Sequence, residues 1–222
     1  MRSPPRSAAT ARRADEPAAP TPAALLAAMA LTGHVASLNV GRAVPVAING
    51  RKVMTAIGKR AVAGPRAVLP LGIEGDEQAD LSVHGGPGKA VYAYPGEHYP
   101  FWQTVRAQAQ VSLWDEALPP GSLGENLTLA GVRESELWIG DVLRFPGCAL
   151  AVSEPRTPCF KFNAAMGFRH AAKLMGESAW CGAYLAVREP GTIAAGDAFT
   201  LVPGPRDVGI VELFRARVRV GA

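Results

Sequence analysis

A single cysteine stands in a stiff, basic segment whose sequence is SEPRTPCFK. Pro155 and Pro158 each fix their own φ and push the residue before them towards extended backbone, which keeps Cys159 off a helix face. Arg156 and Lys161 are close in the sequence, and positive charge favours the thiolate, the form of cysteine that attacks electrophiles and binds metals. The alternative is a half-buried structural cysteine in a loop, because unpaired cysteines commonly pack as small hydrophobic residues.

The chain has two other cysteines, Cys148 and Cys181, and the three show neither a CxxC pair nor the histidine spacing of a zinc site. Cys148 follows a Phe-Pro-Gly turn, and Cys181 precedes a glycine before a strand-like run, so both are predicted to be structural. An odd number of cysteines without a dense framework is typical of a reducing compartment, and we expect a cytoplasmic protein. Cys159 is therefore the candidate reactive thiol.

A glycine-rich segment of sequence DLSVHGGPGK holds a second set of candidate residues. Gly85 and Gly86 allow a ligand to approach the backbone closely, and their amides can form an anion-binding nest beside Lys89. His84 is a candidate proton donor or ligand contact. The alternatives are an ordinary turn for the glycines and a structural hydrogen bond for the histidine.

Two further polar groups stand where predicted strands end, which is where barrel folds carry functional loops. The turn GSLGENL brings Glu125 and Asn126 together, and its alternative interpretation is a solvated turn that enters a strand. Lys59 and Arg60 follow a strand-like alternation, and they either face a phosphate or end that strand in solvent.

The formal net charge of +4 lies in the two ends of the chain. Residues 1–32 hold four arginines and two carboxylates, and residues 205–222 hold the same numbers, so each end contributes +2. Residues 33–204 carry fifteen basic and fifteen acidic side chains. Proteins that bind polymeric nucleic acid with their body normally show a basic face. We therefore expect no polymeric nucleic-acid partner and an anion site that is small and local.

Composition divides the 222 residues into three parts. Residues 1–32 contain eleven alanines and five prolines without a strand pattern, which predicts a disordered or non-native leader rather than an export signal. Residues 33–204 form one globular domain, and residues 205–222 form a C-terminal tail with a helical pattern over 210–220. The sequence lacks a run of the ~18 apolar residues that a membrane-spanning helix needs, so no membrane partner is expected.

Short strand-like runs separated by glycine and proline dominate the domain. Asn49-Gly50 between two of these runs is a strong hairpin signal, because both residues tolerate positive φ. Helical spacing is limited to residues 97–109 and 168–175. Numerous strands without a regular alternation of strand and helix predict a mostly-β barrel with a few short helices in its crossovers. The expected strands are residues 35–40, 44–48, 53–57, 67–71, 90–94, 126–129, 142–145, 149–152, 184–187 and 199–202.

Several motifs in a fixed order resemble the MOSC domain, and more closely its YiiM-type branch. The resemblance covers about residues 34–203. YiiM-type proteins often carry a small three-helix domain after the barrel, and residues 205–222 correspond at most to a remnant of it. The motifs are GIEGD at 72–76, DLSVHGGPGKAVYAY at 80–94, EHYPFW at 97–102, GENLT at 124–128, IGD at 139–141 and EPRTPCFK at 154–161.

The resemblance implies a β-barrel in which a cysteine ligates the molybdenum of a pterin cofactor, the molybdenum cofactor. Cys159 stands at the position of that cysteine. It is the expected metal ligand and, together with His84, the expected catalytic residue. Carried over by position, the candidate cofactor-binding and pocket residues are Asn126, His84, Lys59, Arg60 and Arg156, beside the nest of Gly85 and Gly86.

The YiiM-type branch is linked to the reduction of N-hydroxylated bases and related N-oxygenated compounds, so the resemblance implies a molybdenum-dependent reductase of small molecules. Its expected partner is an external electron-donor protein such as a flavoprotein, since the sequence shows no flavin, haem or iron–sulfur motif. MOSC domains are also proposed to be sulfur carriers that hold a persulfide on the same cysteine. A barrel that binds a small molecule without catalysis is the third alternative.

Overall fold

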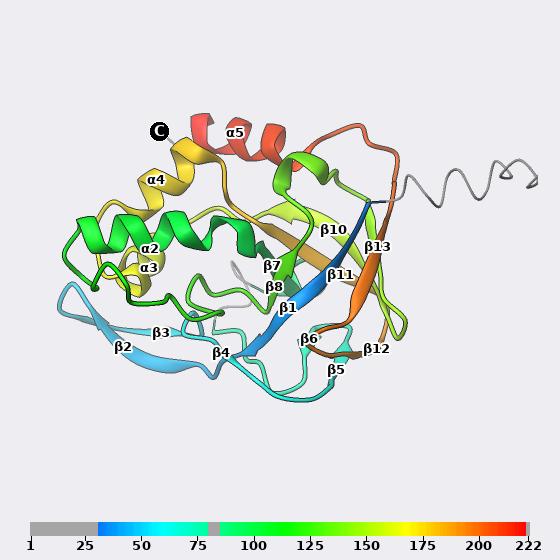
Figure 1. Cartoon of the computed structure of the whole chain (residues 1–222), viewed down its shortest axis with the longest axis horizontal. Coiled ribbons are helices and arrows are strands. Elements are labelled where there is room, and N and C mark those ends of the chain that lie inside the picture. Colours follow the sequence, from blue (N-terminus) through cyan, green and yellow to red (C-terminus); the bar gives the residue numbers. More distant parts are fainter. Residues whose placement is uncertain (1–30, 80–84, 221–222) are drawn as a thin grey trace, which may run out of the picture. The chain divides into compact units, whose positions relative to one another are not determined.

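A closed β-barrel is the centre of the computed structural model, which describes residues 31–79 and 85–220 (Figure 1). Seven strands of this part of the chain form the wall, and β1 pairs with β13 to close it. Neighbouring strands are antiparallel except β7 and β8, which are parallel. Around the barrel the strands are β13 (Ala198–Val202), β9 (Val142–Arg144), β10 (Ala149–Pro155), β11 (Ala183–Glu189), β7 (Val91–Pro95), β8 (Leu127–Ala130) and β1 (Thr32–Val40).

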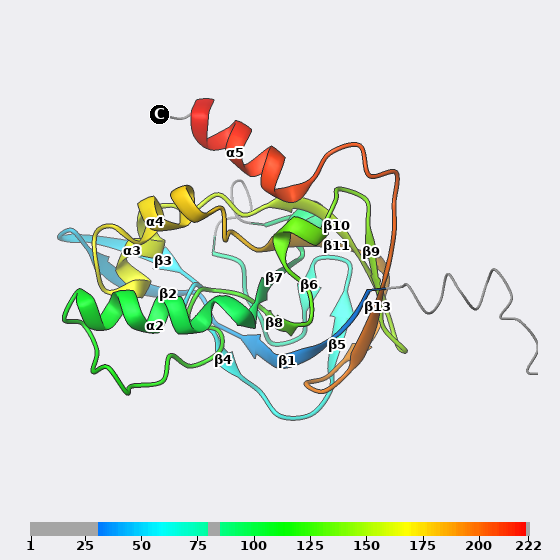
Figure 2. The ribbon, with the colours of Figure 1, turned by 45° about the horizontal axis from the view of Figure 1, so that its top comes forward.

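Shorter strands stand beside the barrel (Figure 2). β2 (Val44–Ile48) and β3 (Arg51–Thr55) form a hairpin whose turn residues, Asn49 and Gly50, have φ values of 50° and 75°. This left-handed backbone is what the Asn-Gly signal predicts. The remaining short strands are β4 (Arg60–Ala61), which pairs with the end of β1, and a three-stranded sheet of β12 (Gly191–Ile193), β5 (Arg66–Leu69) and β6 (Gly72–Ile73).

Three helices of the described residues lie in connections between strands, and the fourth follows the last strand, β13. The first of them, α2 (Tyr99–Gln108), is held to the barrel by Trp102, whose indole nitrogen donates a 2.6 Å hydrogen bond to the hydroxyl of Tyr94 on β7. Within this part of the chain, no helix has both the length and the apolar character needed to cross a membrane. The helices are α2 (Tyr99–Gln108), α3 (Phe160–Met166), α4 (Ala171–Ser178) and α5 (Ile210–Val220), with 3-10 turns at Pro87–Lys89, Gly96–His98 and Glu134–Glu136.

One apolar core fills the barrel and continues under the helices. Leu38, Leu127 and Leu150 from three different strands are fully buried, and each such side chain stabilises the fold by about 1.5–3 kcal/mol relative to an exposed one. α5 packs against β10 and adds Ile210 and Phe214 to the same core. The helical pattern of the C-terminal tail therefore forms a helix that belongs to the packed domain.

The predicted mostly-β barrel with short helices in its crossovers is confirmed. Each expected strand overlaps an observed one, whereas β4, β6 and β12 were not predicted because two or three residues show no alternation. α3 was also not predicted, and the expected helix at 168–175 begins only at Ala171. The leader predicted at residues 1–32 lies outside the described residues except for its last two, and β1 begins at Thr32.

Candidate functional site

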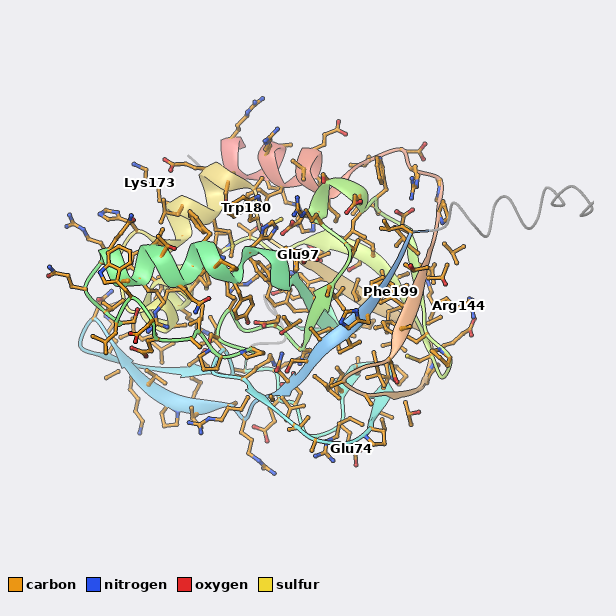
Figure 3. The ribbon with its side chains drawn as sticks, in the orientation of Figure 1. Glu74, Glu97, Arg144, Lys173, Trp180 and Phe199 are labelled. Atoms are coloured by element: carbon orange, nitrogen blue, oxygen red, sulfur yellow. The ribbon has the colours of Figure 1, made fainter. Side chains whose placement is uncertain are left out.

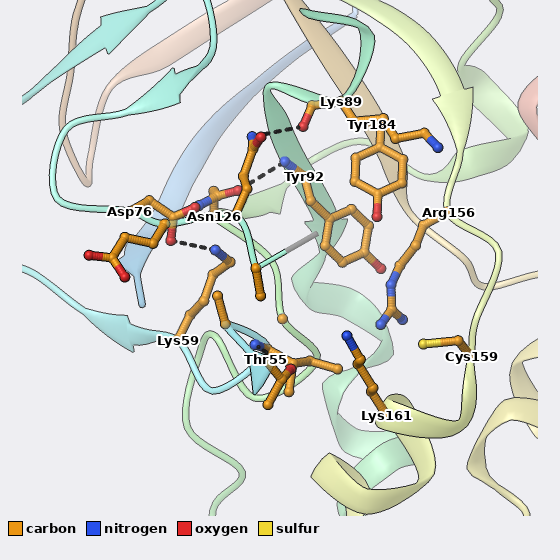
Figure 4. A pocket seen from close by; sticks show the side chains of 16 residues that line it. Thr55, Lys59, Asp76, Lys89, Tyr92, Asn126, Arg156, Cys159, Lys161 and Tyr184 are labelled. Carbon is orange, nitrogen blue, oxygen red and sulfur yellow. Dashed lines mark hydrogen bonds and ion pairs between the residues drawn. The ribbon is translucent and has the colours of Figure 1, made fainter. Parts of the chain in front are cut away.

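A cavity opens between the end of β3, the strands β7 and β11, and the segment that joins β10 to α3 (Figure 4). It contains about 640 Å³ of free space, its open mouth included. The side chains that matter for its chemistry are Lys59, Tyr92, Arg156, Cys159, Lys161 and Tyr184.

The backbone that the two prolines stiffen places Cys159 in the wall of this cavity. β10 ends at Pro155, and Cys159 has extended backbone, with φ −124° and ψ 177°, at the N-cap of α3. Its side chain is half-buried and points towards the cavity (Figure 4). Cys159 thus precedes the first turn of α3 and does not lie on a helix face, as predicted.

The other two cysteines are packed in the core and do not line the cavity. Burial raises the pKa of the Cys148 thiol to about 11. Burial also holds the pKa of Cys181 well above its ordinary value. Both thiols are therefore protonated at neutral pH and unreactive, as structural cysteines are.

Arg156 is a buried cation beside the thiol. Only 5% of the residue is exposed, and its guanidinium lies 4.8 Å from the ring centroid of Phe162 and 5.2 Å from that of Tyr92. Burial lowers the pKa of Arg156, but interactions with Tyr92, Tyr184 and Cys159 outweigh burial and leave that pKa above its ordinary value. Among the described residues, no carboxylate forms an ion pair with Arg156.

A permanent positive charge inside a protein wall is costly unless a negative group faces it. Aromatic faces stabilise a cation by about 0.5–2 kcal/mol, which is less than a charged partner provides. The position of Arg156 therefore favours an anionic group bound in the cavity, next to Cys159.

Lys59 also lines the cavity, and its charge is matched within the protein. Its amino group forms an ion pair with Asp76, and both side chains are almost fully buried. Burial lowers the pKa of Lys59, while Asp76 and Glu125 oppose that effect. Asp76 in turn accepts a 2.8 Å hydrogen bond from the backbone N–H of Gly41. The ion pair therefore joins the segment after β3 to the segment after β6, and both segments line the cavity.

Two tyrosines and two further lysines complete the cavity. The rings of Tyr92 and Tyr184 have centroids 5.3 Å apart, and burial raises the pKa of both hydroxyls. They are therefore neutral hydrogen-bond donors. Lys161 donates a 3.0 Å hydrogen bond to the carbonyl of Met54. Lys89 lies over the Tyr184 ring, 5.8 Å from its centroid.

The GENL turn is buried, so its interpretation as a solvated turn is wrong. Glu125 is fully buried, and its Oε1 accepts hydrogen bonds from the Tyr99 hydroxyl, from the Gly121 N–H at 2.7 Å and from the Thr128 hydroxyl at 2.7 Å. Within the described residues, its Oε2 has no hydrogen-bond partner. Burial raises the pKa of this carboxyl.

Asn126 lines the cavity, but its side-chain amide is hydrogen-bonded to the backbone of β7 and of β1. Its Oδ1 accepts a 3.1 Å hydrogen bond from the Tyr92 N–H, and its Nδ2 donates a 3.3 Å hydrogen bond to the Asn39 carbonyl. Asn126 thereby holds β7 against β1, and it positions Tyr92 in the cavity wall.

The structure brings together Cys159, Arg156, Lys59 and Asn126 of the residues proposed from the sequence. Arg60 is exposed on β4 and does not line the cavity. Gly85 and Gly86 also lie outside its lining, and the Gly86 N–H donates a 3.2 Å hydrogen bond to Gln78 instead of standing open for a ligand. His84 lies outside the described residues.

Sequence reasoning did not find Tyr92, Tyr184 or Asp76. Tyr92 and Tyr184 are partners in the register of β7 with β11, and this pairing joins strands that are far apart in the sequence. A local pattern does not reveal such a pairing. Asp76 carried a usable signal, because it ends the GIEGD motif in a glycine-rich turn.

We expect Glu125 to make the folded chain less stable as pH rises. Because its folded pKa lies above the ordinary 4.5, the folded state keeps a proton that the unfolded state releases. Its contribution to the free energy of unfolding is complete below that ordinary pKa and is lost as pH rises through the folded pKa. Glu125→Gln keeps the acceptor oxygen and cannot ionise, so the stability of this variant in urea unfolding should fall less as pH rises above the ordinary pKa of 4.5.

The exposed Glu116 provides the control, because Glu116→Gln should keep the parental dependence on pH. If Glu125→Gln also keeps the parental dependence on pH, Glu125 is ionised in the folded state, and other interactions offset the cost of burying its charge.

Comparison with known proteins assigns the fold and the cysteine loop to a family. Residues 80–200, more than half of the chain, match the family model of the MOSC domain. The chain belongs to the MOSC family. Protein YiiM of Escherichia coli is 36% identical over 159 residues, which are 71% of this chain and 68% of that protein. The uncharacterised protein YflK of Bacillus subtilis is 38% identical over 162 residues, which are 73% of this chain and 70% of that protein.

The solved structures agree with this assignment. The crystal structure of YiiM from Geobacillus stearothermophilus has a TM-score of 0.66 and 28% sequence identity, and the match covers 85% of each chain. The chain is therefore a YiiM-like MOSC protein. A protein of Gibberella moniliformis that is named a reductase is 33% identical over 174 residues, which are 78% of this chain and 30% of the larger protein. The chain is thus a homologue of a reductase, and it spans less than a third of that relative.

Proposed function

We propose that this chain is a molybdenum-dependent reductase that converts N-hydroxylated bases or related N-oxygenated small molecules to amines. The observation that carries the proposal is that one cavity wall contains both a half-buried thiol, Cys159, and a buried cation, Arg156. Among the described residues, no carboxylate forms an ion pair with this cation. Membership of a family associated with the molybdenum cofactor and homology to a reductase support it.

The residues of the cavity fit the molybdenum cofactor. The described residues contain no cluster of three or more His, Cys, Asp or Glu side chains that would hold a bare metal ion. A lone soft thiolate suits a metal that arrives with sulfur ligands of its own, such as a pterin dithiolene. Cys159 would bind the metal, and Arg156 and Lys161 would face the negative charges of the dithiolene and the pterin phosphate.

The cofactor, when bound, supplies the two-electron chemistry, and the protein supplies binding, orientation and protons. The overall reaction takes an N-hydroxylamine, two electrons and two protons to the amine and one water. The neutral hydroxyls of Tyr92 and Tyr184 can hydrogen-bond a polar substrate at the cavity wall, and the ammonium of Lys161 stands at the same wall as a cationic donor. His84 is proposed to provide protons.

The test uses protein produced in a host with intact cofactor synthesis, analysed for molybdenum and pterin. We expect stoichiometric metal and pterin, and reduction of an N-hydroxylated purine or pyrimidine to its amine with a chemical reductant. An oligonucleotide that contains the same base should react poorly, because the site is a small cavity. Protein that binds the cofactor but reduces no N-hydroxylated compound would refute the reductase proposal.

The partial exposure of Cys159 also suits a second function, that of a sulfur carrier with a persulfide on this thiol. A carrier needs an accessible thiol but no pterin. Protein that lacks molybdenum, carries a cyanide-labile sulfur on Cys159 and passes it to an acceptor would establish the carrier in place of the reductase.

A further inference from the structure

The barrel domain has equal numbers of basic and acidic side chains, but the two kinds are distributed unevenly along the chain. Residues 42–73 contain six basic side chains and no acidic one, and residues 155–176 contain four basic side chains and no acidic one. Since residues 33–204 carry fifteen of each sign, the rest of the domain holds five basic and fifteen acidic side chains. Ten of the fifteen positive charges therefore belong to two segments.

These two segments meet at the cavity. The β2–β3 hairpin, α3 and α4 lie at one end of the domain in both views (Figures 1 and 2). The hydrogen bond from Lys161 to the Met54 carbonyl joins α3 to the hairpin directly. The end of β3 and the start of α3 both line the cavity (Figure 4). Three basic side chains of these segments, Lys59, Arg156 and Lys161, line the cavity that contains Cys159.

Exposed apolar side chains lie among these charges. Phe160, which follows Cys159 directly, is 52% exposed, and Met54 is 47% exposed. Arg51 and Lys52 are exposed at the tip of the same hairpin. We call the surface formed by Arg51, Lys52, Met54, Phe160 and Lys161 the basic face.

We propose that the basic face is the docking surface for an acidic electron-carrier protein with a flavin or iron–sulfur centre. The proposal rests on the reductase function above, in which two electrons per turnover must reach the cavity from outside. Phe160 and Met54 directly adjoin the cavity-lining residues Cys159 and Thr55 in the chain, so a carrier seated on them stands beside the cavity. Positive potential around the cavity would steer an acidic partner to it and fix its orientation.

The mixture of charged and apolar side chains favours a protein partner over a nucleic acid. Protein interfaces combine a desolvated centre, where aromatic residues and methionine are enriched, with a charged rim. Phe160 and Met54 would form that centre, and Arg51 and Lys52 part of the rim.

The experiment compares the full chain with Arg51→Glu/Lys52→Glu and with Arg215→Glu/Arg219→Glu, which reverses two exposed charges on α5. The probes are two acidic carriers, a flavodoxin and a plant-type ferredoxin, with dithionite as the small reductant. We expect the hairpin variant to bind at least one carrier about tenfold more weakly at low salt, with the difference shrinking as salt rises. Dithionite-driven turnover should be unchanged, and the α5 variant should behave like the parent.

Each result separates docking from catalysis, because binding is measured without turnover. If the parent binds neither carrier, or if the hairpin and α5 variants bind equally well, the docking proposal is refuted. If the hairpin variant loses affinity for single-stranded DNA but not for the carriers, the basic face binds nucleic acid and the proposal is wrong. If dithionite drives no turnover in the parent, the reductase function fails, and the binding data still decide on the docking surface.

Discussion

Replacing Cys159 by serine is expected to remove molybdenum from the protein and to abolish reductase activity. Serine keeps the size of the side chain, but its hydroxyl is a hard and weakly acidic group that replaces a soft thiolate poorly as a metal ligand. The fold should tolerate the change, because Cys159 is the half-buried N-cap of α3 and serine is a favoured N-cap residue. Metal analysis, activity and thermal unfolding of Cys159→Ser measure the three parts of this prediction.

The buried cysteines provide matched controls. Cys148→Ala and Cys181→Ala remove thiols of high pKa that do not line the cavity, so both variants should keep their molybdenum and their activity. A loss of stability of about 1 kcal/mol is expected from the small cavity that each leaves in the core. Molybdenum retained by Cys159→Ser would show that the metal is bound elsewhere.

The sequence predicts most of this fold, because its strands are bounded by residues with strong backbone preferences. Asn49-Gly50 specifies a hairpin through positive φ, and the observed turn has that conformation. Pro155 and Pro158 keep the segment before Cys159 extended, and α3 begins immediately after it. α3 itself was missed, since it is only seven residues long and its buried side chains, Phe162 and Met166, are too few to show a period.

The site was less predictable than the fold, because its chemistry depends on burial and on pairing between distant segments. The sequence shows that Arg156 is near Cys159, but its burial arises from packing against Phe162 and Met175 on two helices. Glu125 reads as a polar turn residue, whereas Tyr99, Gly121 and Thr128 enclose it. Pairing between distant segments, such as that of Tyr92 with Tyr184, leaves no periodic trace in the sequence.

Replacing Arg156 by methionine should change cofactor binding and stability in opposite directions. Methionine matches the length of the arginine stem and suits surroundings formed by Tyr92, Phe162 and Met175. In the cofactor-free chain, the variant loses a buried cation that lacks a described carboxylate partner, so the free energy of unfolding should stay level or rise, by up to about 2 kcal/mol. Urea unfolding of cofactor-free protein measures this effect.

Binding of the cofactor should be much weaker in Arg156→Met. Removing one member of a buried charge pair typically costs about 2–5 kcal/mol of binding free energy. That range corresponds to a loss of roughly 30-fold to several thousand-fold in affinity. Molybdenum and pterin retained after gel filtration measure the loss, and Arg156→Lys, which keeps the charge but not the planar fork, should retain an intermediate amount. A structural arginine would give the reverse pattern, in which Arg156→Met unfolds more easily but still carries its cofactor. Opposite signs in the two measurements therefore identify Arg156 as a residue whose buried charge is kept for the ligand.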